Sequence, residues 1–192
     1  MSGLRSCREL RELELYENCV CCIEGLDGLV KLATLDLSYN RIQRMEGLGA
    51  AGLPSLRELY LANNRISAIE GLEGLDRLEV LELGSNQLRR IANLRHLGAL
   101  RELHLGRNDI DLIGEGLAGL ASLRTLGLAS NRLRSLLAAR RISRCTPRWR
   151  SSFRAVTSVR CASPCARPDD PGPSQPVPVS YTHLTLPTTP YV

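Results

Sequence analysis

The chain has 192 residues, enough for one sizeable core, and only 4% of them are aromatic, so that leucine supplies most of the apolar content. The formal net charge of +5 is unevenly distributed, because residues 1–136 hold 17 Lys+Arg against 18 Asp+Glu, whereas residues 137–192 hold 8 against 2. The basic excess lies in the C-terminal segment, which argues against nucleic-acid binding by the chain as a whole.

The first residues, MSGLRSCRELRELELYE, contain no apolar run of the kind that a signal peptide needs. No window of the sequence approaches the run of about 18 apolar residues that a membrane-spanning helix requires. Seven cysteines, an odd number, in such a chain predict free thiols in a reducing compartment. We therefore expect a nuclear or cytoplasmic protein, or one present in both compartments.

One phrase recurs from residue 10 to residue 136, as in LDLSYNRI from Leu35, LYLANNRI from Leu59, LELGSNQL from Leu81 and LHLGRNDI from Leu103. Aligned on the asparagine, the units repeat every 22 to 24 residues and read L-x-x-L-x-L-x-x-N-x-[IVL]-x-x-[ILM]-x-x-L-x-x-L-x-x. In chain order, the units start at Leu10, Leu32, Leu56, Leu78, Leu100 and Leu123.

Within each unit, the L-x-L core has the period of two that is typical of a strand with one buried face. The later apolar positions come every three residues, as in IEGLEGL from Ile69, which suits a short helix or a 3₁₀ turn. A single unit cannot bury both stripes, whereas stacked units can. We predict a right-handed α/β solenoid, a horseshoe with a parallel β-sheet on its concave face and short helices or 3₁₀ turns on its convex face.

The predicted domain covers residues 10–136, with the last repeat incomplete, after a short N-terminal segment at residues 1–9. Gly25, Gly47 and Gly71 share one register, where glycine permits the chain to begin its return. The repeated asparagine side chains are predicted to satisfy backbone groups at the sharp turn after each strand. These structural asparagines are Asn18, Asn40, Asn64, Asn86, Asn108 and Asn131.

The outward residues of the strands form the predicted concave face, which is acidic and carries tyrosines. The residues that we expect to contact a partner there are Glu14, Asp36, Tyr60, Glu82, His104, Tyr16, Tyr39, Glu58 and Glu102. Tyrosines bury area in an interface, and carboxylates steer and discriminate among partners, so that the pattern favours a protein-binding face. A face that is simply solvated is the alternative.

No motif points to catalysis or to a metal. The cluster CVCC offers Cys19, Cys21 and Cys22, but zinc sites need paired ligands at two separated places, and Val20 is a core position. His96 and His104 fall in different registers, and no Ser or Cys stands beside a His and an acid in a recognisable motif. We expect neither an enzyme nor a metal, a cofactor or a small-molecule substrate.

The short unit resembles the 22-residue class of leucine-rich repeats. Within this class, the chain closely resembles the protein phosphatase 1 regulatory subunit 7 family of nuclear, phosphatase-binding horseshoes. The resemblance is carried by the segment LEVLELGSNQLRRIANLRHLGALRELHLGRNDI and covers roughly residues 10–136. It implies a regulatory subunit that binds the protein phosphatase 1 catalytic subunit through mid-strand acidic and aromatic residues.

Asp36, Tyr60 and Glu82 match the family's alternation of acid, aromatic and acid. His104 departs from it, because an aromatic hydrocarbon is expected at that position, and the family has more repeats and a C-terminal cap. An intracellular scaffold with a splicing or ciliary partner is the alternative within the same repeat class.

Residues 137–192 form a basic and then Pro/Ser/Thr-rich tail that does not continue the repeat. We favour a non-native segment, since the final YTHLTLPTTPYV resembles translated adapter sequence. A native disordered tail and a functional basic module are the alternatives; Trp149 and Phe153 among basic residues would suit nucleic-acid binding.

Overall fold

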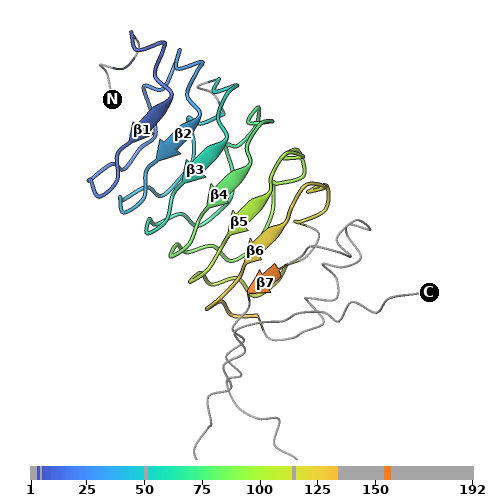
Figure 1. The fold of residues 1–192 in the computed structure, drawn as a ribbon. Helices are drawn as coiled ribbons and strands as arrows, with labels where there is room; N and C mark the ends of the chain where they lie inside the picture. The colour runs from blue at the N-terminus through green and yellow to red at the C-terminus, as the bar shows by residue number, and fades with distance from the viewer. Residues whose placement is uncertain (1–3, 5, 50–51, 114–115, 134–153, 157–192) are drawn as a thin grey trace, which may run out of the picture.

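The computed structural model describes residue 4 and residues 6–49, 52–113, 116–133 and 154–156. In chain order, its strands are β1 (Glu12–Glu14), β2 (Thr34–Asp36), β3 (Glu58–Tyr60), β4 (Val80–Glu82), β5 (Glu102–His104), β6 (Thr125–Gly127) and β7 (Arg154–Val156). All seven form one parallel sheet whose strand order is the chain order (Figure 1). Each of the first six strands is centred on the first leucine of the L-x-L core of a repeat, whereas β7 comes from the tail.

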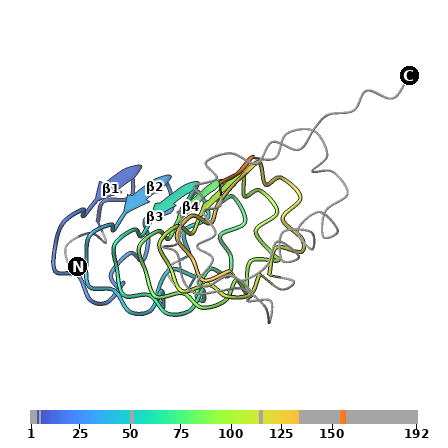
Figure 2. The same ribbon diagram turned by 90° about the horizontal axis from the view of Figure 1, so that it is seen from below.

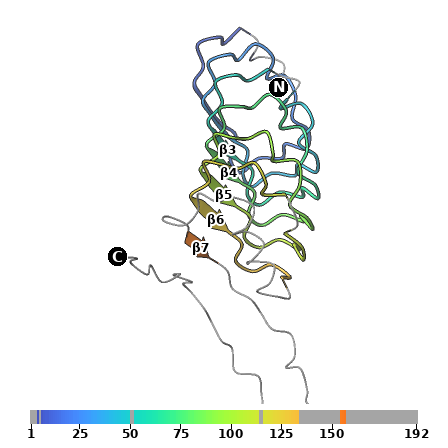
Figure 3. The same cartoon turned by 90° about the vertical axis from the view of Figure 1, so that its right-hand side faces the viewer.

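Each repeat makes one coil of a solenoid. Seen from below, the strands line one side of the coils and the return segments line the other (Figure 2). Seen from the side, the coils stack one on the next (Figure 3). The predicted solenoid with its parallel sheet is therefore confirmed.

The register of the sheet places the middle leucine of each strand beside that of the next. Leu35 of β2 pairs with Leu13 of β1 on one side and with Leu59 of β3 on the other. Leu35 and Leu59 have no exposed surface, and they belong to one continuous core of leucine and isoleucine. Burial of such side chains contributes about 1.5–3 kcal/mol each, so the repeated leucines dominate the stabilisation of the fold.

The return segments contain turns, and no helix of either kind occurs in the described residues. Leu29 N–H donates to the Leu26 carbonyl over 3.2 Å, and Leu32 N–H donates to the Leu29 carbonyl over 3.0 Å. A 3₁₀ helix needs such bonds from consecutive residues, whereas here they start at every third residue. Separate linked turns thus bring each leucine inward, and the helices expected on the convex face are not confirmed.

The asparagine side chains tie each repeat to the one before it. Asn64 Nδ2 donates to the Leu61 carbonyl of its own repeat over 3.1 Å and to the Leu37 carbonyl of the preceding repeat over 2.9 Å. Its Oδ1 accepts a hydrogen bond of 2.9 Å from Ile42 N–H. The same bonds to the preceding repeat recur at Asn40, Asn86, Asn108 and Asn131.

A residue with left-handed backbone geometry immediately precedes each of the six repeated asparagines, Asn18 included. The φ angles lie close to the left-handed value of about +57°. They are 56° at Glu17, 55° at Tyr39, 53° at Asn63, 54° at Ser85, 55° at Arg107 and 57° at Ser130.

Replacement of a mid-stack asparagine should cost far more stability than replacement of the first one. Asn64→Ala leaves several buried backbone groups without partners, so the free energy of unfolding should fall by about 2–4 kcal/mol. Asn18 is exposed, and among the described residues its side chain donates only to carbonyls of its own repeat, so Asn18→Ala should cost less than about 1 kcal/mol. Urea denaturation followed by circular dichroism measures both losses. Equal losses would contradict the role assigned here to the asparagine bonds between repeats.

Candidate protein-binding face

The predicted contact residues all lie on or beside the strands. The parallel register sets Glu14, Asp36, Tyr60, Glu82 and His104 side by side in one row at the ends of the strands. We call the following residues the sheet face: Glu14, Tyr16, Asp36, Tyr39, Glu58, Tyr60, Glu82, Glu102 and His104.

Two carboxylates of this row are held by the backbone just after their own strands. Asp36 Oδ1 accepts a hydrogen bond of 2.8 Å from Ser38 N–H. Glu82 Oε1 accepts one of 2.7 Å from Gly84 N–H. Both side chains are partly buried, so the two acids are fixed in direction before any partner arrives.

Tyr60 and His104, which lie on either side of Glu82 in this row, each contact a glutamate two positions earlier in the same strand. Tyr60 OH donates to Glu58 Oε2 over 3.1 Å. His104 Nε2 lies 3.3 Å from Glu102 Oε2. Burial raises the pKa of the Tyr60 phenol, and the hydrogen bond to Glu58 raises it further. Tyr60 therefore stays a neutral donor at physiological pH, flanked in its row by two acids.

An aromatic pair lies at the N-terminal end of the sheet face. The ring centroids of Tyr16 and Tyr39 are 5.0 Å apart, and their planes are tilted by 56°. Each side chain is nevertheless 48% exposed. In tilted aromatic pairs at this separation, the attraction between the rings adds to the stabilisation that comes from the buried area. The pair therefore offers a supported apolar surface beside Glu14 and Asp36.

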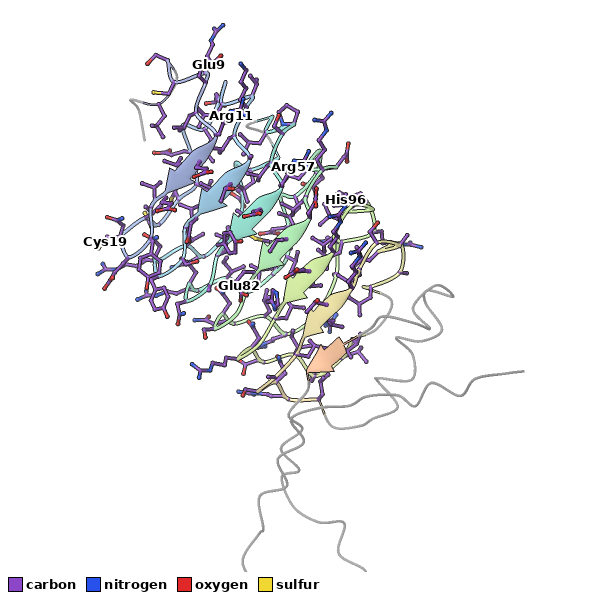
Figure 4. The ribbon with its side chains drawn as sticks, viewed as in Figure 1. Glu9, Arg11, Cys19, Arg57, Glu82 and His96 are labelled. Atoms are coloured by element: carbon purple, nitrogen blue, oxygen red, sulfur yellow. The ribbon has the colours of Figure 1, made fainter. Side chains whose placement is uncertain are left out.

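A basic row at the starts of the strands was not foreseen from the sequence. Arg57 and Arg101 both contact Glu79, which lies between them, at 2.5 and 3.0 Å. Figure 4 shows Arg11 and Arg57 at the strand starts and Glu82 at the strand ends. The sheet thus presents bases along one margin and acids along the other. The signal was the arginine after the first leucine of several units, at Arg11, Arg57, Arg101 and Arg124.

The remaining candidates lie apart from the sheet face. The cysteines Cys7, Cys19, Cys21 and Cys22 are exposed free thiols. Within the described ranges, no group of three or more His, Cys, Asp or Glu side chains could hold a metal ion. His96 Nε2 lies 2.9 Å from the Leu72 carbonyl in a return segment. No helix in the part of the chain that the structure describes is long and apolar enough to span a membrane.

The nucleic-acid-binding alternative depends on residues that the structure does not describe. Trp149, Phe153 and most of the basic tail at residues 137–192 lie outside the described residues. That alternative therefore stays a prediction.

Comparison with known proteins agrees with the architecture. Residues 30–88 match the family model described as leucine rich repeat. An internalin (InlF) of Listeria monocytogenes shares 26% identity over 83% of this chain and 44% of its own, with a TM-score of 0.67. A leucine-rich repeat protein of Leptospira interrogans shares 28% over 70% of this chain and 35% of its own, with a TM-score of 0.62.

The functional domain of InlJ from Listeria monocytogenes has 23% identity over 70% of this chain and 29% of its own, with a TM-score of 0.57, and bears on the fold alone. This chain spans less than half the length of each of these solved proteins. No curated protein matches its sequence significantly.

The described part of the chain has the leucine-rich repeat fold, and this fold suggests a protein-binding scaffold. These comparisons do not support the finer resemblance to phosphatase regulators.

The titration of Glu82 provides a test of the site's electrostatics. Burial raises the pKa of this carboxyl, although Gly84 N–H and His104 act in the opposite direction. The pKa of Glu82 is therefore higher in the folded state than its ordinary value of 4.5. As the pH rises through the folded-state pKa, ionisation of Glu82 lowers the stability of the fold.

Glu82→Gln keeps the acceptor for Gly84 N–H and removes the charge, so it should raise the free energy of unfolding at neutral pH. The gain should vanish at acid pH, where Glu82 is protonated in both states. Urea denaturation across this pH range measures the difference, and a variant that loses stability at neutral pH would refute the sign.

Proposed function

We propose that the sheet face binds a folded protein, and that this partner is the catalytic subunit of protein phosphatase 1. The observation that carries the proposal is the row Asp36, Tyr60, Glu82, in which an aromatic residue lies in register between two acids. This row matches the alternation that the resemblance to the phosphatase regulators implies. In this proposal, the chain is a non-catalytic regulatory subunit.

Pre-organisation supports a binding role for these residues. Asp36 and Glu82 are already fixed by backbone N–H groups, and Tyr60 is fixed by Glu58. Side chains that are ordered in the free protein lose less conformational entropy on binding. Interfaces concentrate their energy in a few such residues, tyrosine prominent among them.

The size of the sheet supports a protein partner over a small molecule. Strands about 4.8 Å apart make a face about 24 Å wide from β1 to β6, which suits a patch of about 800 Å² per partner. The hollows near the sheet, such as the one lined by Arg107, Asp109 and Arg132, are open to solvent. A broad, shallow surface is typical of protein recognition.

Binding would regulate the enzyme by covering part of its surface or by favouring one of its states. A ligand shifts such an equilibrium only in proportion to its differential affinity for the two states. The carboxylates would contribute most to the association rate and to partner choice, since charge complementarity acts chiefly there.

The test is capture of the purified phosphatase 1 catalytic subunit by the full chain and by Asp36→Asn/Glu82→Gln. These substitutions keep the oxygen acceptors for Ser38 and Gly84 and remove two charges. The affinity should fall at least about tenfold, because each desolvated charge contact contributes about 1.5–3 kcal/mol. Surface plasmon resonance measures the dissociation constant, and circular dichroism verifies that the variant folds.

Glu73→Gln/Asp76→Asn is the matched control, since it removes two charges from exposed residues of a return segment. The control should bind as the parent does. No binding by the parent would reject the phosphatase as partner. Recovery of another protein from a cell extract, lost with the face variant, would keep the face and reassign the partner, for example to a splicing or ciliary complex.

A further inference from the structure

The outer edge of β1 is unpaired in the described part of the chain. β1 bonds to β2 on one side, and no described strand lies on its other side (Figure 1). A sheet edge presents free backbone donors and acceptors, which makes it a template for another strand. The other end of the sheet differs, because β7 covers β6 there.

The register identifies which groups of β1 face outward. In β2, Thr34 N–H donates back to the Arg11 carbonyl, and the Asp36 carbonyl accepts from Leu15 N–H. Glu12 is paired with Thr34, and Glu14 with Asp36. The corresponding groups of β1, the Glu12 N–H and the Glu14 carbonyl, therefore point away from β2.

The apolar layer under β1 is incompletely covered. Leu13, Leu15 and Val20 are only partly buried, whereas their counterparts one repeat later have no exposed surface. Those counterparts are Leu35, Leu37 and Ile42.

The asparagine of the first repeat shows the same incompleteness. The Asn18 side chain donates to the Leu15 and Tyr16 carbonyls of its own repeat. Its Oδ1 accepts no hydrogen bond from the described residues, whereas Asn40 Oδ1 accepts one from Val20 N–H. The N-terminal end thus offers the backbone, apolar and amide groups that bind one repeat to another.

The chain itself shows that a segment without the repeat motif can fill such an end. Residues 154–156 read Arg-Ala-Val, yet they pair with β6 in parallel, with Ala155 in the leucine row beside Leu126. Strand addition to this solenoid therefore requires the backbone ladder and not a complete repeat.

The charges of β1 argue against a second copy as the occupant. Two β1 strands related by a two-fold axis would pair antiparallel, which would set Glu12 of one copy opposite Glu14 of the other on the same face. Like charges directly opposite each other destabilise a strand pair, and charged edge residues commonly prevent self-association. Basic residues at those two places would instead pair favourably with both acids.

We propose that the outer edge of β1 binds an extended segment of a partner protein as an added parallel strand. The segment carries an apolar residue opposite Leu13 and lysine or arginine opposite Glu12 and Glu14. Its backbone bonds to the Glu12 N–H and the Glu14 carbonyl, and its apolar side chain covers the open layer. This edge site shares Glu14 with the sheet face but binds through the free backbone edge of β1, and it does not depend on the identity of the partner bound to the sheet face.

The test uses the full chain and fluorescent synthetic peptides of about ten residues, the length of a long strand. One peptide alternates leucine with lysine, a second alternates leucine with glutamate, and a third alternates serine with lysine. The first should bind at least about tenfold more tightly than either of the others, because it alone supplies both the apolar contact and the charge pairs. Fluorescence anisotropy measures the affinities.

Two variants test the assigned geometry. Glu12→Lys/Glu14→Lys should exchange the preference, so that the glutamate peptide binds more tightly than the lysine peptide. Glu12→Pro removes an N–H that has no partner within the described chain and should abolish binding at a position where an edge strand tolerates proline. Glu73→Lys/Asp76→Lys, the same charge change in a return segment, should bind as the parent does.

Hydrogen exchange keeps the test decisive if Glu12→Pro fails to fold. In the parent chain, the Glu12 amide should exchange more slowly when the leucine–lysine peptide is added. Unchanged exchange there, or equal binding of the serine–lysine peptide, would overturn the proposal. So would sedimentation showing a dimer that Glu12→Pro dissociates, since a second copy would then occupy the edge.

Discussion

The structure depends on one interaction, the bond between an asparagine amide and the backbone of the preceding repeat. The amide supplies donors and an acceptor at the place where the strand ends and the ladder can no longer pair the chain. Because the bond joins consecutive repeats at equivalent atoms, as between Asn64 and Leu37 and between Asn86 and Leu61, it reinforces the strand register that the backbone pairing sets. That register in turn sets Asp36, Tyr60 and Glu82 in one row. The candidate site is therefore a consequence of the way in which the repeats are joined.

The sequence was sufficient to predict the sheet and its core, because a fixed period with paired leucines admits few other folds. It was insufficient for the convex side, where apolar residues at every third position suit linked turns as well as helices. The left-handed residue before each asparagine was also missed, since Glu17, Tyr39 and Arg107 share a φ but no chemistry. At these positions the bonds of the following asparagine impose the left-handed conformation, and the conformational preference of the residue itself does not reveal it.

The position shared by Gly25, Gly47 and Gly71 shows that an asparagine side chain can take the place of a glycine at a left-handed turn. A Cβ at Gly47 would lie 2.1 Å from the Ile23 carbonyl oxygen in the present backbone. Two repeats later, Asn93 occupies the same register with a φ of 58°, and its Nδ2 donates to the Ile69 carbonyl over 2.8 Å. The candidate site shows a similar limit of prediction. Its residues could be named from their spacing, but not the bonds that orient Asp36 and Glu82, because these depend on where the chain turns after each strand.

The two ends of the sheet separate the contributions of the backbone and of the asparagine. At β7, backbone pairing continues in register although the motif has ended. At Asn18, the motif is present although no preceding repeat receives its amide. Pairing therefore does not require the asparagine of the added strand, whereas the asparagine needs a neighbouring repeat to be satisfied. Inside the stack both requirements are met by the adjacent coils, which leaves only side chains available for recognition. At an end, the backbone itself becomes available, and recognition there can select for extended shape as well as for charge.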